Sequence, residues 1–390
     1  MTRRADAILV LEDGRTFHGE AYGAVGETFG EAIFTTGMTG YQEALTDPSY
    51  HRQIVTMTAP HIGNTGVNAR DNESDRIWVS GLVVRQPAHV ASNWQSEGEL
   101  EDELSGQGIV GICQVDTRAL TRHLREHGAM RAGISSRDTD AESLLAKVTG
   151  SPRMSGSELV SEVTTGQPYV VESIGAKRYT VVALDLGVKR NTPRRMAHRG
   201  IETHVLPAGS SFEDVLTVQP DAVFLSNGPG DPATATAQVE LTRRLLAEKI
   251  PVFGICFGNQ ILGRALGLET FKLKYGHHGL NQPVIDLTTG KVEITAHNHG
   301  FALKPAGLSP RTGTDGRPVF TPFDTEFGRA QVTHICLNDN VVEGVRGLDF
   351  PAFSVQYHPE AAAGPRDADY LFDRLVELIE GATTKAGNSA

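Results

Sequence analysis

Cys256 lies in a segment whose residue types and spacing could support nucleophilic chemistry. Gly254 and Gly258 stand two residues before and two residues after it. An apolar strand is expected to end at Ile255 and an amphipathic helix to begin within a few residues, so the cysteine would occupy a sharp strand-to-helix turn, a nucleophile elbow. Backbone N–H groups and the dipole at the start of that helix favour the thiolate, which is the reactive form of cysteine. The segment therefore predicts a covalent nucleophile.

The other two cysteines offer a comparison within the same chain. A lone cysteine is often only a small buried apolar residue. Residues Gly111-Ile112-Cys113 repeat the first three residues of the Cys256 segment, but no glycine follows two residues later. We therefore predict that Cys113 and Cys336 are structural and that Cys256 is reactive.

A cysteine nucleophile needs a base and a group that orients the base. His358 and Glu360 stand two residues apart, directly after an alternating segment that begins at Phe353. Because residues two apart in an extended chain point the same way, Glu360 could hydrogen-bond one imidazole nitrogen while the other nitrogen faces Cys256. The His-Pro-Glu run is ambiguous by itself and acquires this meaning only together with the elbow.

A group that stabilises developing negative charge is also required. The loop at 226–232 contains Gly228 and Gly230 and follows an apolar strand expected at 222–225. A rigid loop with exposed amides suits an oxyanion site, whereas the alternative is a plain tight turn. The place of the loop at the carboxyl end of a strand favours the oxyanion site.

The elements that must position these groups alternate between strand and helix from Lys177 onward. Continuous apolar runs predict buried strands at 179–184, 222–225 and 251–255, and a helix is expected at 238–247. This alternation predicts an α/β fold with a largely parallel central sheet flanked by helices. Functional groups then belong at the carboxyl ends of the strands, which is where the elbow would lie.

The first part of the chain predicts a separate, mixed β/α domain. Strands are expected at 8–11 and 54–58, and a helix is expected at 117–126, where Leu120 and Leu124 share one face.

Two other segments have the composition of connecting chain. Weak periodicity with several Ser, Thr and Gly residues suits a linker at 151–176, and Pro, Gly and Thr at about 307–328 suit a surface insertion. The predicted organisation is an N-terminal domain at 1–150, a linker at 151–176, a C-terminal domain at 177–382 and a flexible tail at 383–390.

Composition and charge narrow the class of protein. Hydrophobic residues make up 39% and charged residues 21% of the chain, an ordinary balance for a globular protein. The formal net charge of -11 argues against nucleic acid or an anionic membrane surface as the main partner. Three scattered cysteines suit a reducing compartment, and neither a signal peptide nor a membrane-spanning stretch is indicated, so we expect a cytoplasmic protein.

The elbow, the Gly-Pro-Gly loop and the His-Pro-Glu run together resemble those of class I (triad) glutamine amidotransferases. This resemblance covers about 177–380. Further segments resemble the small subunit of carbamoyl-phosphate synthetases, including the first domain that is private to this subunit. These segments are 39–50, 60–64, 116–118, 185–191, 276–279 with Asn281 and Pro283, and 298–301.

The resemblance implies roles for individual residues. Cys256 would be the nucleophile, His358 the base and Glu360 its partner. Contacts to glutamine are implied at Gly228, Gly230, Phe257, Gln260, Asn298, Gly300 and Phe301, together with Ser49 of the N-terminal domain. Two departures from the family pattern are Asn259, where many relatives have histidine, and the greater length of the insertion at about 307–328.

A glutamine-hydrolysing activity is what the resemblance implies. The thiolate would attack the side-chain amide of glutamine, the Gly230 and Phe257 amides would hold the oxyanion, and His358 would protonate the leaving ammonia. The ammonia would pass through a tunnel to a large synthetase subunit, which joins it to bicarbonate with ATP for arginine and pyrimidine biosynthesis.

The same resemblance implies the partner and the cofactors. We expect a heterodimer, or a higher oligomer of heterodimers, with the large subunit. No metal or other cofactor is expected on this chain, and ATP and Mg are expected on the large subunit. The sequence has no P-loop, which agrees with that division.

Three alternatives remain open. A different class I amidotransferase fits the elbow but not the N-terminal segments. A catalytically silent scaffold for the partner would not need an intact nucleophile, base and carboxylate. A metal-binding module is a weaker alternative, because adjacent histidines rarely converge on one ion and no cysteine or carboxylate pair joins them. Its candidate ligands are His277, His278, His297 and His299.

Overall fold

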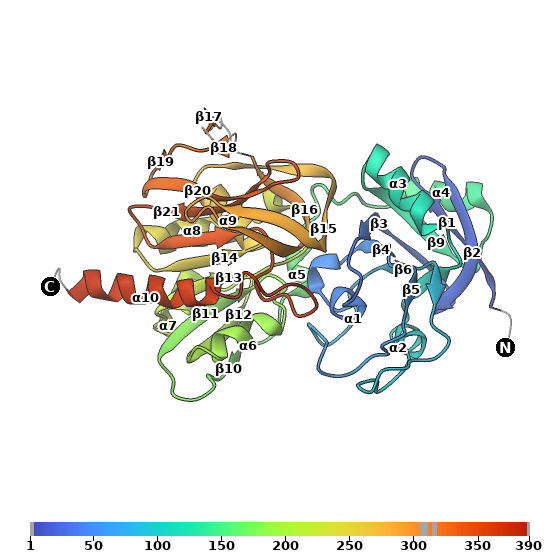
Figure 1. The fold of residues 1–390 in the computed structure, drawn as a ribbon, viewed down its shortest axis with the longest axis horizontal. Coiled ribbons are helices and arrows are strands. Elements are labelled where there is room, and N and C mark those ends of the chain that lie inside the picture. The colour runs from blue at the N-terminus through green and yellow to red at the C-terminus, as the bar shows by residue number, and fades with distance from the viewer. Residues whose placement is uncertain (1–3, 305–310, 314–317, 388–390) are drawn as a thin grey trace. The chain divides into compact units, whose positions relative to one another are not determined.

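The computed structural model describes residues 4–304, 311–313 and 318–387 and divides into two compact units. Unit 1 comprises Met1–Ser157, Leu273–Leu280 and Ala362–Gly364. Unit 2 comprises Glu158–Lys272, Asn281–Ala361 and Pro365–Ala390. Each unit is therefore assembled from several segments of the chain, whose elements are labelled in Figure 1.

A closed barrel forms the centre of unit 1, with the strand order β1-β2-β8-β6-β4-β3-β9. The strands β3, β4, β6 and β8 pair in parallel, and the other neighbours pair antiparallel. The barrel strands are β1 (Asp6–Leu11), β2 (Thr16–Gly23), β3 (Glu27–Thr35), β4 (Gln53–Met57), β6 (Gly81–Val83), β8 (Val110–Cys113) and β9 (Met130–Ser135).

Alternation along β1 explains how the barrel is covered. Leu9 and Leu11 belong to the cluster inside the barrel, whereas Ile8 and Val10 pack with Leu144 of α4. The remaining elements of the unit are α1 (Tyr41–Leu45), η1 (Pro48–Tyr50), β5 (His61–Ile62), β7 (Gln86–Pro87), α2 (Leu100–Gly106), α3 (Thr117–His127) and α4 (Ala141–Gly150).

The strands and the helix predicted in this part of the chain are confirmed. They correspond to β1, β4 and α3. The helix α3 begins after Asp116, whose side chain accepts a hydrogen bond from Ala119 N at 3.0 Å and so caps the first turn. Leu120 and Leu124 are both fully buried, as their spacing predicts.

A mixed sheet forms the centre of unit 2. Its strand order is β10-β12-β11-β13-β14-β22-β21-β16-β15-β20-β19, and the run from β12 to β22 is parallel. The parallel strands are β12 (Ile201–Pro207), β11 (Tyr179–Asp185), β13 (Ala222–Leu225), β14 (Val252–Ile255) and β22 (Ala352–Val355). The parallel core predicted from the apolar runs is thus confirmed.

Helices cover both faces of the parallel strands. Val182 and Leu184 of β11 join the cluster that contains apolar residues of α7, α8 and α9, whereas Val181 and Ala183 join the cluster with α6 and α10. Burial on both faces explains why β11 is continuously apolar. The helices are α6 (Asn191–Ala197), α7 (Phe212–Thr217), α8 (Thr236–Ala247), α9 (Phe257–Ala265) and α10 (Leu371–Gly387), with η2 (Pro232–Thr234) between β13 and α8.

The sheet also has an antiparallel part that the sequence did not predict. Many buried positions of its strands β15 and β16 hold histidine, other polar residues or glycine, so these strands lack the apolar runs by which buried strands are found. The strands are β21 (Val342–Gly347), β16 (Val292–Lys304), β15 (Glu269–Asp286), β20 (Gly328–Cys336) and β19 (Phe323–Thr325), and a small separate pair is formed by β17 (Arg311–Thr312) and β18 (Pro318–Val319).

Two of the predicted connecting segments contain regular secondary structure, and parts of the predicted insertion and tail lie outside the described residues. The expected linker at 151–176 contains α5 (Val160–Val163) and β10 (Tyr169–Val171), which pairs with β12 at the sheet edge. At three residues, β10 is too short to show a periodic pattern. The helix α10 continues to Gly387, past the start of the expected tail at 383. Residues 388–390, and 307–310 and 314–317 of the expected insertion, lie outside the described residues.

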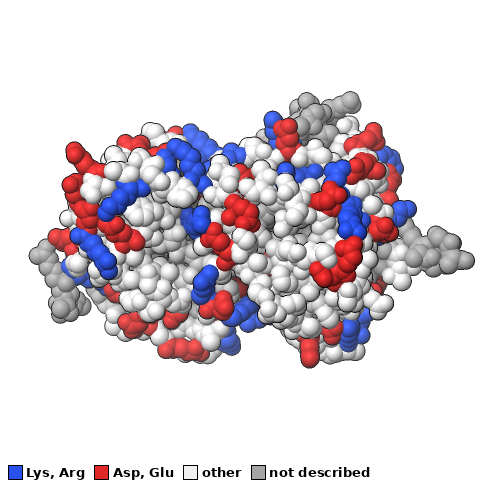
Figure 2. Space-filling model, turned by 180° about the vertical axis from the view of Figure 1, so that it is seen from behind, with Lys and Arg blue, Asp and Glu red and all other residues white. Residues whose placement is uncertain are grey.

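Two observations concern the surface and the helices. On the face in Figure 2, acidic and basic side chains are interspersed, unlike the one-sided basic surface of a nucleic-acid-binding protein. Among the described residues, no helix combines the length and the apolar character needed to cross a bilayer.

Candidate active site

Cys256 occupies the turn between β14 and α9, as its flanking glycines predict. Its backbone has a φ of 56° and a ψ of -102°, a conformation that a residue with a side chain rarely adopts. The surrounding structure holds it there, since the backbone N–H donates to Val355 O at 2.9 Å across to β22. The strained residue is the predicted nucleophile.

The two glycines of the elbow are required by close packing. A Cβ atom on Gly254 would lie 2.6 Å from Gly258 O, and a Cβ atom on Gly258 would lie 2.1 Å from Leu225 O. Both distances are far below van der Waals contact, so the turn from β14 into α9 admits only glycine at these positions. The Gly-x-Cys-x-Gly spacing therefore has a steric cause.

The thiol of Cys256 lies against the strand β16. Its Sγ is 3.5 Å from the backbone O of Asn298, and the cysteine side chain is buried. A carbonyl oxygen only accepts, so the thiol donates to it in this geometry. Asn298, one of the residues predicted to contact glutamine, is thus next to the nucleophile through its main chain.

His358 follows β22, the strand that pairs in parallel with β14. Because parallel strands end at one edge of the sheet, His358 and Cys256 come to the same edge. The Nδ1 atom of His358 lies 2.7 Å from Glu360 Oε1, as the two-residue spacing predicts. Within the part of the chain that the structure describes, Nε2 has no hydrogen-bond partner, which leaves this nitrogen able to exchange a proton.

Glu360 is fully buried and is held as a carboxylate. Burial alone would raise its pKa, but Lys189 Nζ at 2.8 Å and His358 outweigh burial and lower the pKa to about 2. An ionised Glu360 requires a proton on His358 Nδ1, which fixes Nε2 as the basic nitrogen. The pair is arranged like a base and its orienting carboxylate.

Lys189 and Asn191 are two neighbours of Glu360 whose roles the sequence did not reveal. Lys189 pairs with the Glu360 carboxylate, and Asn191 Nδ2 donates to the Glu360 backbone O. Both belong to the segment 185–191, which the sequence analysis used only as evidence of the family resemblance. Its position directly after β11, at the carboxyl end of a parallel strand, is the signal that could have identified them.

Gln260 and Asn259 take part in a buried amide network at the start of α9. Gln260 Nε2 donates to Phe301 O at 2.7 Å and to Gln356 Oε1 at 3.2 Å. Asn259 Nδ2 donates to the same Gln356 oxygen at 2.9 Å, while Ser354 Oγ donates to Asn259 Oδ1 at 2.9 Å. The asparagine at the position of the usual histidine therefore orients the amide that holds Gln260.

The loop that follows β13 is packed too tightly for a side chain at its first glycine. A Cβ atom on Gly228 would lie 2.1 Å from Leu186 O, and Gly230 has a φ of 94°, which favours glycine. Asn227 Nδ2 donates to Gly187 O at 2.8 Å and ties the loop to the chain after β11. These contacts fix a rigid loop at the same sheet edge as the elbow, as an oxyanion site requires.

The remaining predicted residues lie in three places. Phe257 is the first residue of α9, directly after the nucleophile. Gly300 and Phe301 follow Asn298 on β16, and Lys272 Nζ lies 5.0 Å from the centre of the Phe301 ring. Ser49 belongs to unit 1, where its N–H donates to Asp47 Oδ1 at 2.9 Å within η1.

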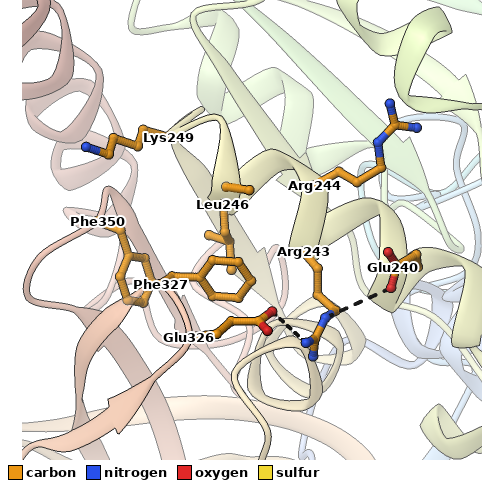
Figure 3. Close-up of a pocket in the computed structure, with 9 residues that line it drawn as sticks. Glu240, Arg243, Arg244, Leu246, Lys249, Glu326, Phe327 and Phe350 are labelled. Carbon is orange, nitrogen blue, oxygen red and sulfur yellow. Dashed lines mark ion pairs between the residues drawn. The ribbon is translucent and has the colours of Figure 1, made fainter.

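A surface cavity of about 760 Å³ in unit 2 is a different feature (Figure 3). Its walls include Phe350, just before β22, and Lys249, just before β14, so it lies at the amino ends of these strands. The elbow and His358 lie at the carboxyl ends, which places the cavity at the opposite edge of the sheet. In Figure 3 Arg243 points toward Glu326, with which it forms an ion pair at 2.6 Å.

Comparison with known proteins gives a family for each part of the chain. The glutamine amidotransferase class-I family matches residues 182–378, and the CPSase domain of the carbamoyl-phosphate synthase small chain matches residues 9–134. A carbamoyl phosphate synthase small chain from Streptomyces avermitilis is 65% identical over 380 residues, covering 97% of this chain and 97% of the relative.

Two further relatives bear the same description. The small chain from Mycolicibacterium paratuberculosis is 59% identical and covers 96% of this chain and 98% of the relative. The small chain from Bifidobacterium longum is 55% identical, and the match covers 97% of this chain and 95% of the relative. This chain belongs to the carbamoyl phosphate synthase small-chain family. The resemblance predicted from the elbow, the His-Pro-Glu run and the N-terminal segments is confirmed.

Membership of the small-chain family also decides between the amidotransferase alternatives. A class I amidotransferase domain occurs with several partners, but the match at 9–134 is specific to the small chain of carbamoyl-phosphate synthase. The elements from β1 to β9, which include the barrel, correspond to the match at 9–134. The mixed sheet of unit 2 corresponds to the amidotransferase match at 182–378.

Proposed function

We propose that this small chain hydrolyses glutamine and supplies the ammonia from which a large synthetase subunit makes carbamoyl phosphate. The observation that carries the proposal is the strained elbow at Cys256, with His358 and Glu360 at the end of the neighbouring strand. A backbone strained at a reactive thiol and a base oriented by a buried carboxylate are what nucleophilic catalysis needs.

The chemistry begins with proton transfer from the Cys256 thiol to His358 Nε2. The thiolate attacks the side-chain amide carbon of glutamine, and the backbone N–H groups of Gly230 and Phe257 stabilise the oxyanion. The carbon–nitrogen bond then breaks as His358 returns the proton to the leaving nitrogen, which departs as ammonia. A glutamyl thioester remains on the enzyme.

Hydrolysis of the thioester completes the cycle. His358 Nε2 removes a proton from water, the oxygen of water attacks the thioester, and the sulfur leaves as glutamate forms. Glutamine would be held through Gln260, Asn298, Gly300 and Phe301, with Gly228 in the adjoining loop. None of these steps requires a metal ion.

The partner completes the reaction. Ammonia passes through a tunnel to the large subunit, which consumes ATP with Mg and joins the nitrogen to bicarbonate for arginine and pyrimidine biosynthesis. The two chains form a heterodimer or a higher oligomer of heterodimers. For the compartment we propose the cytoplasm, because three separated cysteines suit a reducing environment.

The test is the variant Cys256→Ala in the complex with the large subunit. We expect glutamine-dependent carbamoyl phosphate synthesis to fall by ~1,000-fold or more, because the covalent route is removed. Synthesis from added ammonium should stay within about twofold of normal, because the large subunit is unchanged. Equal loss of both activities would contradict the proposal, and full retention of the glutamine-dependent activity would favour a silent scaffold.

A further inference from the structure

Three buried titratable side chains of unit 2 take no part in the steps above. His297 and His299 lie on β16, and their side chains point the same way because they are two residues apart on a strand. Glu343 lies on the neighbouring strand β21. The side chains of His297, His299 and Glu343 are 0%, 2% and 0% exposed, so their polar atoms must interact with groups inside the protein.

Their potential ligand atoms are close together. His297 Nδ1 lies 3.1 Å from His299 Nε2. Glu343 Oε2 lies 3.7 Å from His297 Nδ1, and Glu343 Oε1 lies 3.9 Å from His299 Nε2. The two carboxylate distances exceed ordinary hydrogen-bond lengths, whereas one ligand atom from each of the three residues lies within 4.8 Å of the others.

The other nitrogen of each ring determines where the hydrogens are. His299 Nδ1 lies 2.9 Å from Phe301 O, and a carbonyl only accepts, so this nitrogen carries the hydrogen. Thr295 Oγ1 donates its single hydrogen to Gln282 O at 2.9 Å and lies 2.8 Å from His297 Nε2. The hydroxyl oxygen must therefore accept from the imidazole, and His297 Nε2 carries the hydrogen.

These two assignments leave two lone pairs facing each other. In the neutral rings, His297 Nδ1 and His299 Nε2 are both acceptors, and they are 3.1 Å apart. Two lone pairs at this separation repel, and the carboxyl group of Glu343 lies nearby. A positive species between the nitrogens, either a proton or a metal cation, resolves the repulsion.

The geometry points to a metal cation. We propose that His297 Nδ1, His299 Nε2 and the Glu343 carboxylate bind a zinc ion, with a fourth position for a further ligand. Zinc bonds to nitrogen and oxygen of roughly 2.05 Å require ligand atoms about 3.3 Å apart in a tetrahedron, and the two histidine nitrogens lie 3.1 Å apart. Histidines that bind zinc also donate the other ring hydrogen to an oxygen, as both rings do.

Two reasons from the sequence argued against a metal on this chain: adjacent histidines rarely converge on one ion, and no cysteine or carboxylate pair joins them. Glu343 supplies a carboxyl group, and only the pairing of β21 with β16 brings it close, because the two strands are separated in the sequence. An imidazolium stabilised by Glu343 is the competing occupant of the same position, and metal analysis distinguishes it from zinc.

The site has a consequence for the nucleophile that rests on the proposed function. Asn298 lies between the two ligand histidines, and its backbone O is the atom 3.5 Å from Cys256 Sγ. An ion that ties β16 to β21 would hold this carbonyl and the following residues in place. Zinc would therefore position the glutamine-binding strand and take no part in bond making.

The primary measurement is the metal content of the full chain, purified without chelators, alone and in complex with the large subunit. We expect about one zinc per chain, determined by plasma mass spectrometry. The variants Glu343→Gln and His297→Gln should each lose most of this zinc. The matched control is His334→Gln, a histidine as buried as the others that has Asp286 at 3.8 Å, and this variant should keep its zinc.

A second measurement uses the wild-type chain, so it remains informative if the variants fail to fold. The wild-type chain is stripped with a chelator and titrated with zinc, iron(II) or manganese, and the midpoint of thermal unfolding is followed. Zinc binding to the folded state should raise the midpoint and should displace roughly one equivalent of a chromogenic zinc indicator at saturation. X-ray absorption should give a first shell of nitrogen and oxygen at about 2.0–2.1 Å.

The outcomes separate this inference from the proposed function. Absence of bound zinc, together with no rise in the unfolding midpoint on titration, overturns the metal site and favours the imidazolium. Zinc that persists in both variants overturns the assignment of its ligands. Another divalent ion, bound once per chain and lost in both variants, supports the site and overturns the choice of zinc. None of these results depends on glutamine hydrolysis, which the Cys256→Ala variant tests separately.

Discussion

The segments around Cys113 and Cys256 begin with the same three residues, Gly-Ile-Cys, yet they form different structures. Cys113 is the last residue of β8 and is fully buried in the barrel unit, and burial raises the pKa of its thiol to about 11. Cys256 is outside β14, has a positive φ and caps α9 directly.

The two segments differ in which residue has a positive φ. After β8 the residue with a positive φ is Gln114, at 62°, and α3 begins only after Asp116. After β14 the residue with a positive φ is Cys256 itself. We infer that the cysteine of a Gly-Ile-Cys run acts as a nucleophile only where the turn starts at the cysteine and a second glycine lets the helix begin at once.

Among the variants that test this comparison and keep Cys256, the largest effect is expected from removing the second glycine. In Gly258→Ala the new Cβ would lie 2.1 Å from Leu225 O, so the start of α9 must move. We expect glutamine-dependent activity to fall by ~100-fold or more and the free energy of unfolding to fall by about 1–3 kcal/mol. Steady-state kinetics and chemical denaturation measure the two effects.

The control for this variant is Gly209→Ala, because a Cβ there meets no atom within 4 Å. It should leave both activity and stability near those of the wild type. If Gly258→Ala behaved like its control, the steric account of the elbow would be wrong.

A smaller loss is expected from Lys189→Gln. The change removes the cation 2.8 Å from Glu360, so the pKa of this carboxyl should rise and His358 should be oriented less firmly. We expect glutamine-dependent turnover to fall by roughly 10- to 100-fold, part of the contribution of a positioned base. Ammonium-dependent synthesis in the complex should be unaffected.

The surface pair Lys177–Glu202, at 2.6 Å, supplies the control for the buried cation. Lys177→Gln should change turnover by less than about twofold, because exposed ion pairs contribute little. Similar losses in the two lysine variants would show that general charge, and not the buried contact, matters.

The pH dependence of stability should reveal the same carboxylate. The pKa of Glu360 is lowered from 4.5 to about 2 in the folded state, so its ionised form stabilises the fold above pH 4.5. That contribution is lost as the pH falls through 2. The stability difference between the wild type and Glu360→Gln should therefore be constant from pH 7 to 5 and shrink below 4.5. Denaturation series at each pH would contradict this account if the difference changed mainly above pH 5.

The smallest effect on activity is expected from Cys113→Ser. No elbow surrounds this thiol, so glutamine turnover should stay within a few-fold of normal, while burying a hydroxyl in an apolar site should cost about 1–3 kcal/mol of stability. The same holds for Cys336, where burial raises the pKa of the thiol to about 12. A large loss of turnover in folded Cys113→Ser protein would remove the distinction between the cysteines.

Local patterns predicted much of this architecture. The apolar runs at 179–184, 222–225 and 251–255 correspond to β11, β13 and β14, because strands buried on both faces must be apolar throughout. The elbow followed from two glycines and a cysteine, and the pairing of His358 with Glu360 followed from a two-residue spacing. Each of these features is local in the sequence.

Features formed by distant segments could not be predicted in the same way. Lys189 reaches Glu360 across the parallel sheet, and Glu343 reaches His297 and His299 only when β21 pairs beside β16. The edge strand β10 is only three residues long, too short for a periodic pattern, so its pairing with β12 depends on the finished sheet. Tertiary pairing, and not local propensity, decides these positions.

The most direct test of the central claim is to trap the acyl-enzyme. The protein is mixed with isotopically labelled glutamine and quenched in acid within one turnover, and its peptides are mapped by mass spectrometry. The account predicts a labelled glutamyl thioester on the peptide that contains Cys256 and on neither of the other cysteine peptides. Label on Cys113 or Cys336, or glutamate formation that continues undiminished in Cys256→Ala, would contradict it.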